Sequence, residues 1–477
     1  MKTTHVLFVL LLVSLSVDDV HAGGQSEFSR YFKDRTFRLD YFHTGTKGEE
    51  RINADKMYEE GGWPGSMAAL VDTMNLGEYF FEIIDVAGSR TIYSRGYSSL
   101  FNEWQTTDEA LAGTYRTFQE SVRFPYPLRK FQLKILRRNK QMVFNEIYSS
   151  VIDPSAVEIH HGNRGVNVRS FDVFSNGDAH AKVDIAILGD GYTKEELPKF
   201  RKDVAHFTDV LFSTEPFKHR KKDFNVHAVE VESHASGINQ PDKALWVENA
   251  LGTMYNSFGS ARYVLTDENR LVRDYAATVP YDFLFILVNT NRYGGGGIFQ
   301  LYATCFTVGE TPATAWQADY VFVHEFGHSF AGLGDEYYAS SVAYNEFYQK
   351  GVEPWEPNIT ANISRPSLKW NDLVETQTVL PTPWNKVVYD SMENERGKIK
   401  RDTPGYAEKR QAILDAERSV LENKQLAGTI GAFEGAGYSS TGLFRPSLDC
   451  RMFSLSLTDF DPVCTRAIER MIDFYTR

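Results

Sequence analysis

Residues 324–337 constrain the fold of this chain more than any other stretch, because they combine a helical metal-binding spacing with a glycine turn. They begin with an HExxH motif formed by His324, Glu325 and His328. Positions i and i+4 of a helix lie on one face, so the two histidines can present their imidazoles to a single point. Two such histidines bind zinc, and the glutamate between them can act as a general base towards water on the metal. We therefore expect a helix that enters near Trp316 and carries a zinc site.

A catalytic zinc site needs a third protein ligand and one open position. No histidine follows His328 in the chain, so a third histidine would have to come from upstream. Gly332 and Gly334 let the chain turn back sharply after the helix, and this return delivers Asp335. Asp335 is our preferred third ligand. The alternatives are its neighbour and two later acids: Glu336, Glu346 and Glu353.

Length and composition bound the class of protein. The 477 residues suffice for two domains, and 42% hydrophobic with 24% charged residues is ordinary for a globular protein. The formal net charge of -12 gives no indication of a nucleic-acid-binding surface.

Residues 1–22 have the pattern of a secretory signal peptide. Lys2 supplies the positive end, residues 6–17 form a short apolar core, and residues 20–22 resemble a cleavage site. No later run reaches the roughly 18 uninterrupted apolar residues that a membrane-spanning helix needs. We therefore expect an exported, extracellular protein without a membrane span.

Export permits disulfides and, in some hosts, glycosylation. Of the three cysteines, Cys450 and Cys464 are the pair we expect to be bonded, which leaves Cys305 free or buried. Two N-glycosylation sequons start at Asn358 and Asn362.

Residues 23–160 carry strand signals and dense aromatic residues, which favours a small antiparallel β-sandwich domain. We interpret it as a structural domain, with a substrate- or glycan-binding module as the alternative. The clearest alternating segments are residues 36–41, 79–86, 130–136 and 142–148. Residues 160–165, which include His160 and His161, are predicted to form a linker.

The pattern changes to α/β in residues 161–477. Residues 183–188 indicate a strand buried on both faces, and Thr193 with Glu196 forms a capping box that opens a helix. Further strands are expected at residues 225–231 and 283–288. Four consecutive glycines then follow, at residues 294–297. They favour an edge strand that substrate backbone can approach; a flexible loop is the alternative.

The C-terminal part contains three further features. Residues 393–426 are predicted to form a surface helical hairpin, to which we attach no chemistry. Met452 follows a proline-bearing loop in the manner of the methionine turn below metzincin zinc sites. Tyr438 and Arg445 are candidates for stabilising the oxyanion that forms when water attacks a carbonyl.

Several sequence blocks together resemble the IgA-peptidase family of secreted zinc metallopeptidases. They are AILGDGYT (186–193), YDFLFILVNTNRYGGGGI (281–298), HEFGHSFAGLGDEYY (324–338), LKW (368–370), PTPW (381–384), GAFEGAGY (431–438) and GLFRPSLDCRM (442–452). The resemblance implies a metzincin-like zincin domain, with a mixed sheet and an active-site helix, preceded by the family's N-terminal β-domain. It also implies zinc held by His324, His328 and Asp335, with Glu325 as the general base.

The predicted function is that of a secreted zinc endopeptidase acting on protein or peptide substrates. The rival from another class is an extracellular adhesion protein, binding glycan or protein, whose metal is structural. An amidase using the same zinc chemistry is a third hypothesis. The oligomeric state and the role of the N-terminal domain are not indicated by the sequence.

Overall fold

The computed structural model describes residues 27–162, 166–308, 315–339, 347–400, 404–455 and 459–477. The predicted signal peptide, residues 1–22, and the alternative ligand Glu346 therefore lie outside the described residues. Among the helices that are described, none has the length and apolar character that crossing a bilayer requires.

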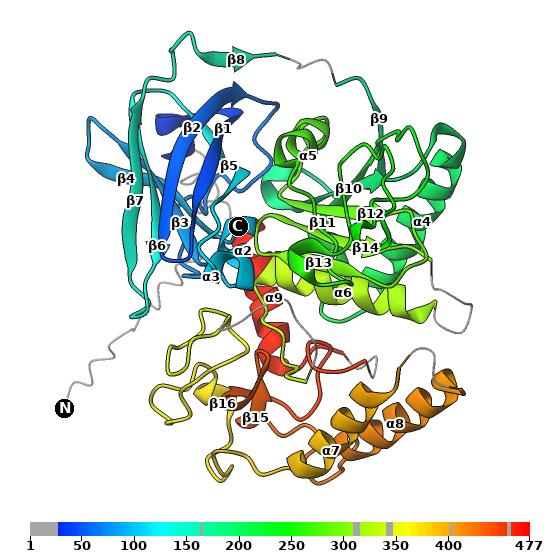
Figure 1. Ribbon diagram of the computed structural model, residues 1–477. Coiled ribbons are helices and arrows are strands. Elements are labelled where there is room, and N and C mark those ends of the chain that lie inside the picture. The colour runs from blue at the N-terminus through cyan, green and yellow to red at the C-terminus, as the bar shows by residue number, and fades with distance from the viewer. Residues whose placement is uncertain (1–26, 163–165, 309–314, 340–346, 401–403, 456–458) are drawn as a thin grey trace, which may run out of the picture.

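The N-terminal region consists of two four-stranded sheets that pack face to face around an aromatic core (Figure 1). Phe37 and Phe81 from different sheets both contact Phe124, with ring centroids 4.9 Å and 6.2 Å away. The first sheet contains, in order, β5 (Arg116–Pro127), β1 (Phe32–Thr46), β2 (Glu49–Glu59) and β8 (Ile159–His161). The second contains β4 (Arg90–Tyr97), β3 (Tyr79–Asp85), β6 (Phe131–Arg138) and β7 (Phe144–Ile152). Two short helices, α2 (Leu100–Trp104) and α3 (Asp108–Leu111), connect β4 to β5.

The residues predicted as a linker belong in part to this region. His160 and His161 lie in β8, which pairs in parallel with β2. A ring nitrogen of His161 lies 2.7 Å from a carboxylate oxygen of Glu59 on β2. The linker prediction is therefore wrong for these two residues, because β8 extends the first sheet by one short strand.

A mixed six-stranded sheet forms the centre of the second region (Figure 1). Its order is β13 (Gly295–Ile298), β14 (Tyr302–Phe306), β12 (Phe283–Val288), β10 (Val183–Asp190), β11 (Phe224–Glu230) and β9 (Arg169–Phe174). The four inner strands are parallel, and the two edge strands run antiparallel to their neighbours. Every residue of β10 and β12 is buried, as expected for central parallel strands covered on both faces.

Helices α4 (Leu197–Leu211) and α6 (Trp316–Ala331) pack together against this sheet. Phe322 of α6 stacks between Phe207 of α4 and Phe285 of β12, with centroids 5.0 Å and 4.0 Å away. The predicted capping box of Thr193 and Glu196 precedes α4. A further helix, α5 (Asn269–Ala276), contacts both β10 and the N-terminal strand β5.

The C-terminal region lies below the sheet in Figure 1 and ends by returning to it. It contains α7 (Lys386–Lys398), α8 (Tyr406–Leu421), β15 (Phe433–Ala436), β16 (Ser439–Arg445) and α9 (Pro462–Tyr475). Helices α7 and α8 form the predicted hairpin. Helix α9 begins at its cap Asp461 and contacts α6. The carbonyl of Arg477, which follows α9, accepts a hydrogen bond of 2.7 Å from Ser66 in the loop between β2 and β3, so this segment contacts the N-terminal region.

Candidate metal centre

Helix α6 holds the two motif histidines one turn apart. The Nε2 atoms of His324 and His328 lie 3.1 Å from each other, as the i, i+4 spacing predicts. The helix ends at Gly332, whose left-handed conformation (φ 63°) turns the chain back. A side chain is excluded there, since a Cβ would lie 2.7 Å from the Trp355 ring. The turn is therefore fixed both by backbone conformation and by packing.

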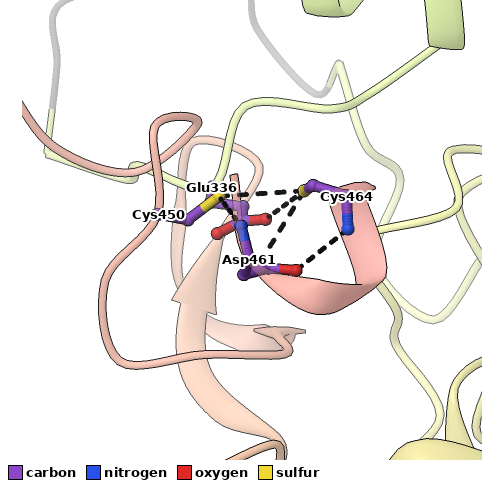
Figure 2. A group of neighbouring side chains, drawn as sticks. All are labelled: Glu336, Cys450, Asp461 and Cys464. Carbon is purple, nitrogen blue, oxygen red and sulfur yellow. Dashed lines mark hydrogen bonds between the residues drawn. The ribbon is translucent and has the colours of Figure 1, made fainter. Parts of the chain in front are cut away.

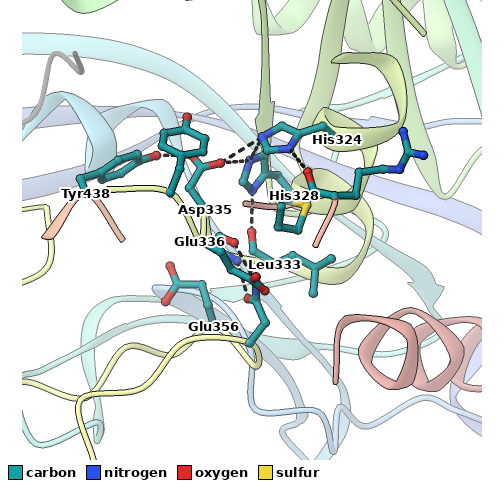
Figure 3. A network of polar contacts seen from close by, with 12 residues as sticks. His324, His328, Leu333, Asp335, Glu336, Glu356 and Tyr438 are labelled. Atoms are coloured by element: carbon teal, nitrogen blue, oxygen red, sulfur yellow. Dashed lines mark hydrogen bonds and ion pairs between the residues drawn. The ribbon is translucent and has the colours of Figure 1, made fainter. Parts of the chain in front are cut away.

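The chain that returns from this turn brings Asp335 to the histidines (Figure 3). Its Oδ1 lies 3.0 Å from His324 Nε2 and 3.2 Å from His328 Nε2. Ligands at about 2.0–2.1 Å from a tetrahedral metal are separated by about 3.3 Å, so these three atoms have the spacing of one metal's ligands.

Hydrogen bonds on the far side of each imidazole fix which nitrogen faces Asp335. Nδ1 of His324 donates to the Arg451 carbonyl at 3.1 Å, and Nδ1 of His328 donates to the Leu333 carbonyl at 2.5 Å. In the neutral imidazoles, both Nε2 atoms therefore point a lone pair at the carboxylate. Asp335 Oδ1 is buried, and the two imidazoles are the groups that face it. Three acceptors that meet in this way need positive charge between them, which a proton on an imidazole or a metal ion supplies.

The pKa values show the same need for positive charge. Burial disfavours a charged imidazole, yet the Asp335 carboxylate raises the pKa of His328 to about 9. Burial likewise opposes ionisation of Asp335, but the two imidazoles hold its pKa well below its usual range. The residues present fit a divalent metal ion, whose charge would balance the carboxylate without a proton.

Glu325 faces a cavity beside the three candidate ligands. Burial raises its pKa, whereas the neighbouring His324 and His328 oppose that rise. The cavity is also lined by Arg262 and Tyr337. Arg262 donates a hydrogen bond of 3.1 Å to the Tyr337 hydroxyl, and the Tyr337 ring stacks on His324. Sequence reasoning missed Arg262, because it lies in a loop more than 60 residues before the motif.

The two residues proposed for oxyanion stabilisation have different positions. The Tyr438 hydroxyl donates to Asp335 Oδ2, so Tyr438 orients the candidate ligand from the cavity wall. Arg445 is fully buried and donates to the carbonyls of Gly435 and Leu448 at 2.7 Å and 3.1 Å. It is therefore unavailable to a substrate, and its assignment is corrected.

Met452 packs against α6 at Gly327. A Cβ on Gly327 would lie 3.2 Å from the Met452 sulfur, so the absence of a side chain there lets the turn approach the helix. The Met452 carbonyl accepts a hydrogen bond of 2.9 Å from Glu336. The turn thus supports both the helix and the returning chain.

Family models matched to the sequence agree with this architecture. The model described as IgA Peptidase M64 matches residues 171–472, and the one described as Peptidase M64 N-terminus matches residues 27–149. The chain belongs to the IgA peptidase M64 family. As a member of that family it is a metallopeptidase, with a metal in its site and protein or peptide as substrate. None of the curated protein sequences compared with it gives a match.

The glycine-rich segment of this M64 family member forms edge strand β13, and its glycines allow close packing on both sides. A Cβ on Gly297 would lie 2.3 Å from the Glu325 carbonyl oxygen, and one on Gly296 would lie 2.5 Å from the Tyr263 ring. The outer edge is partly occupied, because Gly295 exchanges backbone hydrogen bonds with Arg262 and Val264 at 3.2 Å and 3.1 Å. The free part of this edge is therefore shorter than the glycine run.

Glu336 and Glu353, the alternative third ligands within the described residues, do not face the two histidines. Glu336 Oε1 accepts a hydrogen bond of 2.9 Å from the Asn358 amide and lies on the other side of the returning chain (Figure 3). Glu353 accepts a hydrogen bond from Thr360 and forms an ion pair of 3.0 Å with Lys369.

Asn358 is fully buried and also bonds both backbone groups of Gly334. Asn358 holds the chain that follows α6 in place and cannot accept a glycan in the folded chain. The prediction of glycosylation at the first sequon is therefore wrong. Asn362, at the second sequon, is exposed.

The predicted disulfide is also wrong. Cys305, Cys450 and Cys464 are all buried and free, and the sulfurs of Cys450 and Cys464 lie 3.8 Å apart. The two residues do meet, as the prediction required, but they share their surroundings with two carboxylates that the local sequence does not reveal.

The α7–α8 hairpin borders the M64 site, although the sequence gave it no role. A second cavity shares His324, Glu325 and Arg262 with the first and is lined on its far side by Arg396 and Glu417. Arg396 of α7 and Glu417 of α8 form an ion pair of 3.0 Å. On the opposite side, the first cavity is lined by residues of the N-terminal region: Ser98, Asn102 and Glu103. The site therefore lies in a cleft with walls from three parts of the chain.

Proposed function

We propose that the protein is a secreted zinc endopeptidase in which His324, His328 and Asp335 hold the metal and Glu325 is the general base. One observation carries the proposal. Three ligand atoms meet within about one metal's ligand spacing, and the cavity beside them is lined by Glu325. Metal-assisted hydrolysis requires a set of metal ligands and a carboxylate base beside the same cavity, and these residues provide both.

When bound by these residues, zinc supplies a Lewis acid that polarises a carbonyl and lowers the pKa of water. Glu325 accepts a proton from water and passes it to the leaving amine. Asp335 is held in place by Tyr438, and His324 and His328 are oriented by carbonyl acceptors at their Nδ1 atoms. The Arg262 guanidinium, paired with Tyr337 in the cavity wall, stabilises negative charge on the substrate carbonyl oxygen.

An extended peptide suits the cleft better than a small amide. The two joined cavities run from the N-terminal region past Glu325 to the helical hairpin. The substrate would lie along the free part of the β13 edge, where Gly297 is half-buried and the other residues of the strand are buried.

We also propose a domain organisation, a signal peptide and a glycosylation site for the chain. The active-site helix, the mixed sheet and the methionine turn under Gly327 support a metzincin-like zincin domain spanning residues 161–477. Residues 23–160 would form the preceding β-sandwich domain, and residues 1–22 a cleaved signal peptide. The exposed Asn362 would be the glycosylation site. The adhesion alternative is not favoured, because the family is one of peptidases.

Digestion of a proteome-derived peptide library, with and without a zinc chelator, tests the function. We expect internal cleavage that stops with the chelator and returns with added zinc, identified by mass spectrometry. Turnover of small amides without any peptide cleavage would instead establish an amidase.

The variant His328→Ala tests which residues hold the metal. Its loss removes one ligand, so we expect the site to lose its zinc and its activity together. Elemental analysis showing undiminished zinc in the folded variant would overturn the ligand assignment.

A further inference from the structure

A second cluster of ligand-type side chains lies behind the first, on the other side of the returning chain. It consists of Glu336, Cys450, Asp461 and Cys464, which come from the return after α6, from the methionine turn, and from the start of α9. One ligand atom from each lies within 4.8 Å of the others. None of the four residues is more than 5% exposed. Figure 2 shows the four side chains converging on one point.

Three distances within this cluster match the coordination of one ion. The two sulfurs lie 3.8 Å apart, and Cys464 Sγ lies 3.2 Å from Glu336 Oε1 and 3.7 Å from Asp461 Oδ2. Tetrahedral zinc with bonds of about 2.3 Å to sulfur and about 2.0 Å to oxygen separates two sulfurs by about 3.8 Å and sulfur from oxygen by about 3.5 Å. Two thiolates also select zinc over magnesium or calcium.

Outer contacts direct the ligand atoms inward. Asp461 Oδ1 caps α9 by accepting from the backbone N–H groups of Val463 and Cys464 at 2.7 Å and 2.9 Å, which leaves Oδ2 for the cluster. The sulfur of Cys450 accepts from the backbone N–H groups of Met452 and Asp461 at 3.5 Å and 3.4 Å. Burial raises the pKa of both thiols, and the backbone donors at Cys450 partly oppose that rise.

A buried oxygen in the cluster has no partner. Glu336 is fully buried, and its Oε2 forms no hydrogen bond within the described part of the chain. Leaving a carboxylate oxygen unpaired in the interior is costly, and a bound cation removes that cost. Two carboxylates and two thiolates exceed a divalent charge, and the buried Arg445 guanidinium interacts electrostatically with Glu336 to offset part of the excess.

We propose that Glu336, Cys450, Asp461 and Cys464 hold a second, structural zinc ion. With four protein ligands the site is closed, which is the coordination of structural zinc rather than catalytic zinc. The ion would tie together three segments that also support the first site. Glu336 follows Asp335, and the turn that carries Cys450 provides the carbonyl of Arg451 to His324.

Cobalt substitution provides the test, because only the second cluster contains sulfur. Protein produced in zinc-depleted medium with Co²⁺ should show a near-ultraviolet sulfur-to-cobalt charge-transfer band. The zinc-grown protein should contain two metal equivalents by elemental analysis. Cys464→Ser should lose the band and one equivalent, whereas Cys305→Ser, the matched control at the remaining cysteine, should retain both.

The wild-type protein decides the question even when Cys464→Ser does not fold. Absence of the sulfur band in folded, cobalt-loaded wild-type protein would overturn the proposal. So would an intact mass of the zinc-grown protein lower by two hydrogens, with peptide mapping that joins Cys450 to Cys464 as a disulfide. The peptidase assignment is measured separately: a protein with one metal equivalent and full peptide cleavage refutes only the second site.

Discussion

The two ligand clusters, set back to back on one return of the chain, differ in what surrounds them. His324, His328 and Asp335 border a cavity that continues into a long cleft. Glu336, Cys450, Asp461 and Cys464 are enclosed by the methionine turn and the start of α9. Adjacent residues, Asp335 and Glu336, point to opposite sides, so a one-residue step separates a site with room for substrate from one without. Openness, rather than ligand type alone, distinguishes a reactive metal site from a structural one.

Chelation should produce the largest difference between the clusters. A brief treatment with a zinc chelator should abolish peptide cleavage, because the open cluster exchanges its metal through the cavity. The sulfur-to-cobalt band of the closed cluster should persist over the same time. Parallel assays of cleavage and absorbance check this. Simultaneous loss of both signals would mean that the two clusters are equally accessible.

Glu325→Gln should reduce turnover by about 10²–10⁴-fold, the usual contribution of a general base. Both metals should be retained, since Glu325 is in neither ligand set. The exposed Glu158, altered to Gln in the N-terminal region, serves as the control and should leave turnover unchanged. Peptide cleavage by Glu325→Gln at the wild-type rate would remove this residue from the mechanism.

Tyr438→Phe should weaken the open cluster alone. It removes the hydroxyl that donates to Asp335, and loss of such an outer contact typically lowers metal affinity by about 10–100-fold. Competition with a chelator of known affinity measures the change in zinc binding, while the cobalt–sulfur band should stay the same. An unchanged affinity would show that Asp335 needs no support from Tyr438.

Arg396→Ala should have the smallest effect. Arg396 lines the far cavity next to Glu417, whose pKa is raised by burial to about 7 in spite of that ion pair. Removing a partly exposed cation from a substrate cleft should change KM for peptides by about two- to five-fold, with kcat and both metals unaffected. Steady-state kinetics on a cleaved peptide provide the measurement. A large fall in kcat would assign the hairpin a catalytic rather than a binding role.

The sequence predicted the main helices and strands better than it predicted strand pairing and burial. The strands β10 and β12, the capping box before α4 and the hairpin of α7 and α8 all follow from local periodicity and turn residues. Strand β8 escaped prediction because three residues carry too little pattern, and only pairing with β2 makes them a strand. Asn358 appeared to be a glycosylation site because a sequon carries no information on burial.

What the sequence by itself determined is the local part of the first cluster. The i, i+4 histidines, the glycine that must adopt a left-handed turn, and the acid that follows are all within twelve residues, so helix geometry places them together. Only the tertiary structure brought Glu336 to Cys450, Asp461 and Cys464, which are more than a hundred residues away. It also decided that Tyr438 supports Asp335, that Arg262 enters the cavity and that Arg445 does not. The physical reason is that contacts between distant segments depend on how whole elements pack, and α9 and the methionine turn reach α6 only when the core is assembled.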